Sequence, residues 1–458
     1  MSHSKEHFQP VEDPAGGDIA ALQAAFRSGT LAPSARLDRC LTAARSTPAS
    51  FITLMEERAR AEAAASDARH ADGKPRGPLD GIVVSYKDII DCAGTRTTAG
   101  SPLGAESQPA AADAPIVSAL TDAGAIAIGK TNLTEFAFSV LGVNPHFGTP
   151  DNPRHPGHVP GGSSSGAAVA VARGACTIAV GSDTSGSIRV PAAFCGLAGF
   201  KPSPGRYPMA GVFPLAPSLD TLGFLARRAR DIALVDEVLA GDAGRATSRA
   251  AGSDLSRWPI IVPEGVLTED LEAPVAAAFE IALQRIAAAG GRIDRRPVPA
   301  IEAAQMTLSQ HGAMVGFEAV KVHAALLAAP ARLARIDPNV RQRLQQAARR
   351  PAEDYAALVT QRARLAADLA ADIGEAILVC PTVPHLAPEC APLLSDPARF
   401  AAVNLRTLRN TMLGSYLRLP GLALPAGPAS LLASAAEGHD ERLLAIGPAL
   451  EAALAPLE

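Results

Sequence analysis

Two glycine- and serine-rich segments on either side of a short apolar stretch constrain the fold of this chain more than any other feature. The stretch Val159 to Ser187 reads VPGGSSSGAAVAVARGACTIAVGSDTSGS. Its alanine- and valine-rich run up to Arg173 predicts a helix, since serine is a favoured N-cap and Gly174 can take the left-handed conformation at the end. Cys176 to Val180 predicts a buried strand, followed by a loop over Gly181 to Ser187.

One serine cluster is therefore expected at the start of a helix and the other at the end of a strand. Both places present free backbone N–H groups, which favour a developing negative charge. The pattern predicts a serine nucleophile with an oxyanion hole, although glycine- and serine-rich loops also serve as plain linkers.

Strands and helices alternate around this stretch. Ile82 to Tyr86 predicts a strand that ends at Lys87, and Ile116 to Ala123 predicts a helix before a short buried strand over Ala125 to Ile128. This alternation predicts an α/β architecture with a largely covered sheet. The other predicted elements are two or three helices from Asp18 to Ala71 with Ser34 as a cap, a helix over Asp231 to Ala240, strands over Ile377 to Pro381 and Leu422 to Leu424, and a last helix over Asp440 to Ala453.

Residues 245–371 differ from the rest of the chain. They begin with a Ser/Gly/Arg-rich link and become rich in alanine and arginine with helical periodicity, which predicts a helical layer over the sheet. Residues 1–16 are predicted to form a flexible tail. We therefore expect a single domain over 17–458, in which 245–371 is a less typical helical layer.

The composition excludes several classes of function. A net charge of −4 disfavours nucleic acid as a partner. No membrane partner is expected, because the most apolar window, 167–180, is too short to span a bilayer. The polar N-terminus shows no secretory signal, and the six cysteines lack CxxC spacing. We therefore expect a cytoplasmic protein with reduced, mostly buried cysteines.

Lysine is rare in this chain, which makes Lys87 a candidate for chemistry. Only six of the 42 basic residues are lysines. Arginine keeps its proton at working pH, whereas a desolvated lysine can lose it and act as a base. Lys87 directly follows the apolar strand, where α/β sheets hold their active sites. The alternative is an ordinary solvated surface lysine.

Three separated motifs, taken in order, resemble the amidase signature family. They are VVSYKDIIDCAGTRTTAGSP, GGSSSGAAVAVA and GSDTSGSIRVPAAFCGLAGFKPS. The resemblance is strong from Pro78 to Leu225, weaker at ILVCPTVPHLAP and LPGLALPAG, and absent from 245 to 370. It implies the amidase-signature fold, a large twisted mixed β-sheet covered by helices on both faces.

The resemblance also implies a catalytic triad of Ser187, Ser163 and Lys87. In the family, the serine at the position of Ser187 is the nucleophile, and the one at Ser163 follows a cis peptide bond and bridges to the lysine at Lys87. Neutral Lys87 would draw a proton through Ser163 from Ser187, which attacks a carboxamide carbon. No metal and no organic cofactor takes part.

The loop before the nucleophile has implied roles as well. The backbone N–H groups of Thr184, Ser185 and Gly186 would form the oxyanion hole, and Asp183 and Arg189 match positions that brace the loop.

The chain departs from the family at two positions. The family usually has GGSSGGS and GSDTGGS, whereas Ser165 and Ser185 here replace one glycine of each motif. Ser185 adds a Cβ beside the oxyanion loop, where glycine would allow unusual backbone angles. We expect the chemistry to survive and the fine geometry to change.

The expected substrate is a small soluble carboxamide. Aromatic residues make up 4% of the chain and no membrane-binding stretch is visible, which disfavours a lipid amide. The resemblance leaves room for a homodimer or a small accessory subunit.

Three alternatives stay open at the level of sequence. Residues 162–166 fit the G-x-S-x-G nucleophile elbow of an α/β-hydrolase esterase, with Ser164 as nucleophile. His155 and His158 form an H-x-x-H pair that could hold a metal, although the intervening Pro-Gly precludes helical spacing. The third is an A subunit of an aminoacyl-tRNA amidotransferase, which shares this core and works in a multi-subunit assembly. The esterase would need a catalytic histidine, and the sequence around the candidates does not mark any of them for this role: His311, His323, His385 and His439.

Overall fold

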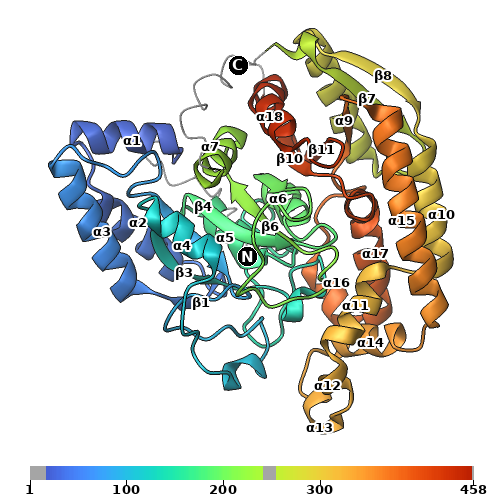
Figure 1. Cartoon of the computed structure of the whole chain (residues 1–458), viewed down its shortest axis with the longest axis horizontal. Helices are drawn as coiled ribbons and strands as arrows, with labels where there is room; N and C mark the ends of the chain where they lie inside the picture. The colour runs from blue at the N-terminus through green and yellow to red at the C-terminus, as the bar shows by residue number, and fades with distance from the viewer. Residues whose placement is uncertain (1–16, 241–253, 456–458) are drawn as a thin grey trace, which may run out of the picture.

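One mixed β-sheet runs through the whole molecule. The computed structural model describes residues 17–240 and 254–455, and Figure 1 shows the sheet between helices α1–α3 at one end and α10 and α15 at the other. Its eleven strands have the order β1-β3-β2-β4-β6-β5-β10-β11-β9-β7-β8. The predicted tail over 1–16 and the start of the link, 245–253, lie outside the described residues.

The strands of the sheet pair in both directions. Strand β2 lies parallel between β3 and β4, and β7 lies parallel between β8 and β9, whereas the other pairs are antiparallel. The strands are β1 Phe51–Leu54, β2 Val83–Lys87, β3 Ile126–Thr131, β4 Ile178–Asp183, β5 Ala198–Lys201, β6 Thr221–Ala226, β7 Pro259–Glu264, β8 Arg292–Pro297, β9 Ile377–Pro381, β10 Gly421–Ala426 and β11 Ala429–Ser434.

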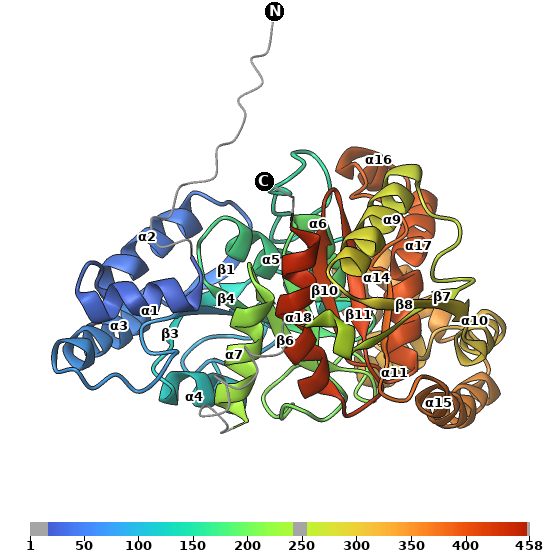
Figure 2. The ribbon, with the colours of Figure 1, turned by 90° about the horizontal axis from the view of Figure 1, so that it is seen from above.

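Helices cover both faces of this sheet (Figure 2). The α-helices named in the text are α1 Ile19–Ser28, α2 Pro33–Arg45, α3 Glu56–Ala71, α4 Pro115–Asp122, α5 Ser165–Ala172, α6 Arg189–Cys195, α7 Ala229–Leu239, α9 Ala273–Ala288, α10 Pro299–His311, α11 Met314–Val322, α12 Ala324–Leu327, α13 Pro330–Leu333, α14 Pro338–Ala347, α15 Ala352–Ile373, α16 Cys390–Ser395, α17 Pro397–Tyr416 and α18 Asp440–Leu454.

The side chains of β4 alternate between two hydrophobic cores. Ile178 and Val180 belong to a core that includes Ile232 of α7. Ala179, between them, belongs to a second core that includes Val169 of α5. Since successive side chains of a strand point to opposite faces, α5 and α7 cover opposite faces of the sheet. The expected α/β fold with helices on both faces is confirmed.

The parallel pair β2 and β4 positions the candidate site. Tyr86 lies opposite Val180 in this pair, so both strands end at the same edge of the sheet. Lys87 is the last residue of β2, and Asp183 is the last residue of β4. The two loops that leave this edge therefore begin next to each other.

Residues 254–371 do more than form a helical layer. Helices α9 to α15 are present, but β7 and β8 also extend the sheet at its edge. The prediction missed β8 because its sequence, RIDRRP, is polar and mostly exposed, as edge strands often are. The prediction of Ser34 as a helix cap was also wrong, because α2 begins at Pro33 with Ala32 as its N-cap.

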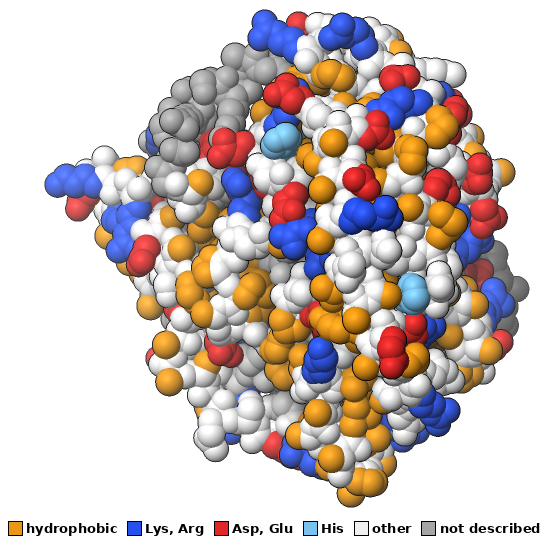
Figure 3. Space-filling model, turned by 45° about the vertical axis from the view of Figure 1, so that its right-hand side comes forward, with side chains coloured by type: hydrophobic (Ala, Val, Ile, Leu, Met, Phe, Trp, Pro, Cys, Tyr) orange, Lys and Arg blue, Asp and Glu red, His pale blue; other side chains and the backbone are white. Residues whose placement is uncertain are grey.

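The surface and the cysteines agree with the composition. Figure 3 shows positive and negative side chains interspersed on the face that it presents, rather than gathered by sign. Within the described ranges, no helix combines the length and the apolar character that crossing a bilayer requires. All six cysteines are free thiols, and five of them are buried.

Candidate active site

Lys87 is fully buried between two serine hydroxyls. Its Nζ donates hydrogen bonds to Ser163 Oγ at 2.7 Å and to Ser182 Oγ at 2.9 Å. Burial lowers the pKa of the Lys87 ammonium from 10.5 to about 7, although the negative charges of Asp183 and Asp220 oppose this change. A substantial fraction of Lys87 is therefore neutral near pH 7 and can accept a proton.

Ser163 lies at a turn just before α5. The peptide bond between Gly162 and Ser163 is cis, as the sequence resemblance predicts. The Ser163 carbonyl accepts a hydrogen bond from the backbone N–H of Thr134 at 3.2 Å, and its side chain is fully buried against Lys87. The first serine cluster is thus held at the carboxyl edge of β2.

Ser187 lies in the loop between β4 and α6. Its carbonyl accepts a hydrogen bond from the N–H of Ser164 at 3.2 Å, which ties the second serine cluster to the first. The residue is only 3% exposed. Within residues 17–240 and 254–455 its hydroxyl makes no hydrogen bond, so the oxygen has no competing partner.

Asp183 and Arg189 brace the loop that carries Ser187. Arg189 Nε and Nη2 each donate to the Asp183 carboxylate at 2.9 Å, and both side chains are fully buried. The carboxylate also accepts from the N–H groups of Gly186 and Ile188. Burial alone would raise the pKa of Asp183, but Arg189 and these N–H groups hold it below its usual value. Asp183 therefore stays ionised and fixes the backbone on both sides of Ser187.

Each of the three predicted oxyanion-hole residues has a different environment. The Thr184 hydroxyl donates to Asp220 at 2.6 Å, and the Ser185 carbonyl accepts from Thr411 Oγ1 at 2.7 Å. The Gly186 N–H donates to Asp183 at 2.6 Å and is therefore not free in this structure. No hydrogen bond is found in the described part of the chain for the N–H groups of Thr184 and Ser185. The predicted oxyanion hole thus depends on these two.

Comparison with known proteins agrees with this geometry. A family model described as Amidase matches residues 34–444. The chain belongs to the amidase family. It is 35% identical over 456 residues to 2-amino-5-chloromuconic acid deaminase of Comamonas testosteroni, with 95% of each chain covered. It is 33% identical over 431 residues to the A subunit of the glutamyl-tRNA(Gln) amidotransferase of Thermosynechococcus vestitus, with 88% of each covered.

Solved amidase structures have the same fold. A crystal structure of an amidase superposes with a TM-score of 0.81 at 32% identity and covers 96% of this chain and 100% of its own. Together with the family match, these relatives identify the chain as an amide-cleaving hydrolase.

The amidase family assignment leaves the esterase alternative without support. The Ser164 hydroxyl donates a hydrogen bond to the Ser182 carbonyl at 3.3 Å. His385 forms a hydrogen bond with Thr407 instead, and His311 with Asp354. Among the described residues, no histidine forms a hydrogen bond with Ser164 that could activate it.

The H-x-x-H pair forms no metal site. The rings of His155 and His158 lie 5.8 Å apart. Across the described ranges, no group of three or more histidine, cysteine or carboxylate residues is arranged to hold a metal ion.

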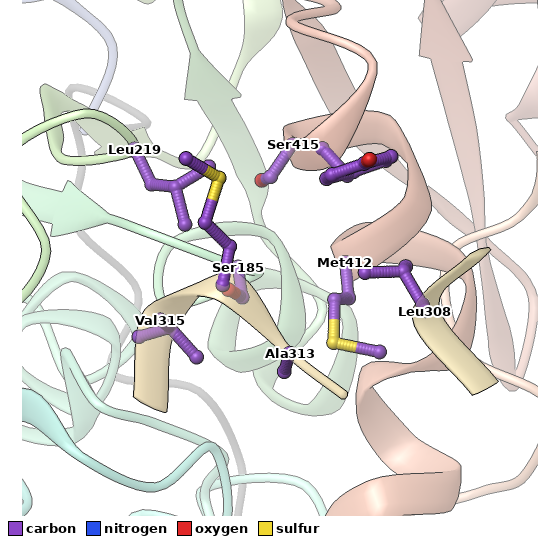
Figure 4. A pocket seen from close by; sticks show the side chains of 9 residues that line it. Ser185, Leu219, Leu308, Ala313, Val315, Met412 and Ser415 are labelled. Atoms are coloured by element: carbon purple, nitrogen blue, oxygen red, sulfur yellow. The ribbon is translucent and has the colours of Figure 1, made fainter. Parts of the chain in front are cut away.

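A small, mostly apolar cavity lies beside the oxyanion loop of this amidase (Figure 4). Ser185 contributes to its wall, and so do Ala313, Met314 and Val315 from the start of α11. The start of α11, in the segment where no motif resembled the family, therefore reaches the site. The complete lining is Ser185, Leu219, Leu308, Ala313, Met314, Val315, Met412, Ser415 and Tyr416.

Sequence reasoning missed three residues that support the site. Ser182 accepts a hydrogen bond from Lys87, and Asp220 accepts one from the Thr184 hydroxyl. The Thr411 hydroxyl donates a hydrogen bond to the Ser185 carbonyl. Ser182 could have been found, because it stands inside the GSDTSGS motif next to Asp183. The other two carry no local signal, since they come from the chain before β6 and from α17.

Proposed function

We propose that this hydrolase cleaves small soluble carboxamides through an acyl-enzyme on Ser187, with Ser163 and Lys87 as a proton relay. The observation that carries the proposal is the 2.7 Å contact between Lys87 Nζ and Ser163 Oγ in a buried site that lowers the lysine pKa to about 7. A lysine that kept its proton would have no lone pair for this role.

The relay works in two directions. Ser163 gives its proton to neutral Lys87 and takes the proton of Ser187, whose oxygen attacks the amide carbon. The N–H groups of Thr184 and Ser185 stabilise the oxyanion that forms. As the C–N bond breaks, the proton returns through Ser163 to the leaving nitrogen, which departs as ammonia or an amine.

Water completes the reaction. A water molecule loses a proton to the same relay and attacks the Ser187 ester, and the ester oxygen leaves with that proton. The net change is one amide plus one water to one carboxylic acid plus ammonia or an amine. None of these steps uses a metal or an organic cofactor.

The size of the substrate follows from the surroundings of Ser185. The cavity beside the loop that carries Ser185 is small and lined mostly by apolar side chains, which disfavours a bulky acyl group. The relative from Comamonas testosteroni is named for a small acid, 2-amino-5-chloromuconic acid, which agrees with a small soluble substrate. The buried free thiols support a cytoplasmic location.

A panel of amides tests the proposal. Short aliphatic, aryl and dicarboxylic monoamides are incubated with the wild type, and ammonia and amine release is measured. Ser187→Ala should reduce release to near background. Ser165→Ala, which removes a buried hydroxyl that has no hydrogen-bond partner among the described residues, should keep most of it. Equal release from the wild type and Ser187→Ala would refute the proposal.

A second candidate is the catalytic component of a multi-subunit amidotransferase. The 33% identity over 88% of the Thermosynechococcus vestitus protein favours it. In that case the protein works only with partner subunits, and hydrolysis by the isolated chain should be weak. Co-purification of the chain from its own cells, followed by mass spectrometry of the proteins that accompany it, separates the two candidates.

A further inference from the structure

A hollow beside the candidate site contains an arginine without an acidic partner. The hollow has a volume of about 300 Å³, and its wall includes Phe138, Val315, Phe317, Arg343 and Arg350. The two arginines differ in whether a carboxylate pairs with them. Arg350 pairs with Asp354 at 3.2 Å, whereas Arg343 has no carboxylate within ion-pair distance among the described residues.

Arg343 is nevertheless held firmly. Its Nη1 donates to the Phe138 carbonyl, and its guanidinium lies 4.2 Å from the centre of the Phe138 ring. Burial lowers the pKa of Arg343 to about 10, so the side chain stays cationic at neutral pH. Burying a cation without a counter-charge lowers the stability of the folded protein, and an anionic ligand beside it offsets that loss.

The hollow adjoins the cavity beside the oxyanion loop. Ala313 and Val315 line both spaces, and Ser185 lines the inner one. Figure 4 shows the segment that carries Ala313 and Val315 running past Ser185. Ala313 and Val315 therefore lie between Arg343 and the loop that carries Ser185.

The helix that carries Arg343 is anchored to the candidate site. At the start of α14, the N–H of Asp337 donates to the Glu135 carboxylate at 2.5 Å. Thr134, next to Glu135, holds the Ser163 carbonyl. Arg343 thus has a fixed position relative to Ser163, which a specificity residue needs.

We propose that Arg343 binds a carboxylate of the substrate, so that this hydrolase prefers amides of dicarboxylic acids in which the free carboxylate lies several bonds from the scissile amide. The inference rests on the proposed function and adds a substrate class to it. Arginine suits this role because its planar guanidinium matches the two oxygens of a carboxylate.

Matched substrates test the inference. The monoamides of succinic, glutaric and adipic acid are compared with butanamide, pentanamide and hexanamide, in which a methyl group replaces the carboxylate. The wild type should prefer at least one acid over its neutral partner. Arg343→Met should lower kcat/KM for that acid roughly 10–100-fold, mainly through KM, and change the neutral amide less than about threefold.

Arg341→Met is the control. Arg341 lies on the same helix but does not line the hollow, so removing its charge should not change the ratio of acid to neutral amide. Arg343→Lys keeps the charge and should retain part of the preference. Equal rates for acids and neutral amides in the wild type, or an equal loss on both in Arg343→Met, would overturn the inference and leave the hydrolase assignment intact.

A binding measurement is independent of turnover and of the proposed mechanism. Titration of glutarate into the Ser187→Ala protein by calorimetry should give saturable binding that the added Arg343→Met change removes. No binding of glutarate, succinate or adipate would overturn the inference. Hydrolysis of no amide by the wild type would instead count against the proposed function.

Discussion

Replacing Lys87 with methionine should make the protein more stable at low pH while removing its activity. Lys87 is fully buried, and its pKa falls from 10.5 to about 7 on folding. At about 1.4 kcal/mol per pKa unit, this corresponds to about 5 kcal/mol of lost stability below pH 7. Methionine has a similar length and carries no charge, so the variant should recover part of that energy.

The sign of the pH dependence is specific to a buried lysine. Between pH 7 and 10.5 the unfolded chain keeps the proton of Lys87 while the native state releases it, so the cost shrinks as the pH rises. The stability advantage of Lys87→Met should therefore be about 3 kcal/mol larger at pH 6 than at pH 9.5. Loss of the bonds to Ser163 and Ser182 lowers the advantage by about 1 kcal/mol each at both pH values.

Urea unfolding at pH 6 and pH 9.5 measures this difference directly. Lys74→Met is the matched control, because Lys74 is exposed and its removal should have no pH-dependent effect. A stability difference between Lys87→Met and the wild type that is the same at both pH values would contradict the lowered pKa of Lys87. Lys87 would then not lose its proton on folding, and it could not be the base.

Three further predictions concern turnover. For the wild type, kcat/KM should rise as the pH passes through about 7 and stay high above that pH. Lys87→Arg should be inactive at every pH, because guanidinium cannot accept a proton. An active arginine variant would contradict the proton relay. Ser163→Ala should lose roughly 10²–10⁴-fold in kcat, and activity within a few-fold of the wild type would remove Ser163 from the mechanism. Gly186→Ala should lower kcat strongly, because the φ of Gly186 is +143° and a Cβ there would lie 2.3 Å from Thr411 Oγ1. The second change Thr411→Ala reduces that contact and should restore part of the rate. An unchanged kcat in Gly186→Ala alone would contradict the proposed loop geometry.

The sequence predicted the core of the fold because its strands are short apolar runs that end in recognisable motifs. Ile377–Pro381 was predicted with the bounds that the structure shows, and β2 and β4 lie within a few residues of their predicted places. Strand β8 was missed because an edge strand needs no apolar run. Helix α17 was not predicted, although Asp396 and Pro397 mark its start.

In the candidate site, too, the residues in local motifs were predicted and those from distant segments were not. Lys87 and Ser163 were predicted from local motifs, and the structure brings them into contact. Thr411 and Arg343 come from segments more than 150 residues beyond Ser187. Only the folded chain brings Thr411 to Ser185 and Arg343 to the neighbouring hollow. Their positions depend on how α14 packs against α11 and how α17 packs against α6, α10 and α16, which local periodicity does not encode.

Covalent labelling of the nucleophile shows directly whether Ser187 is the reacting residue and whether Lys87 activates it. The wild type is treated with a fluorophosphonate, digested, and the modified peptide is sequenced by mass spectrometry. A single adduct should form on Ser187, disappear in Ser187→Ala and form much more slowly in Lys87→Met. An adduct on Ser164 would contradict the role of Ser187 as nucleophile, and labelling of Ser187 at an unchanged rate without Lys87 would contradict the role of Lys87 as base.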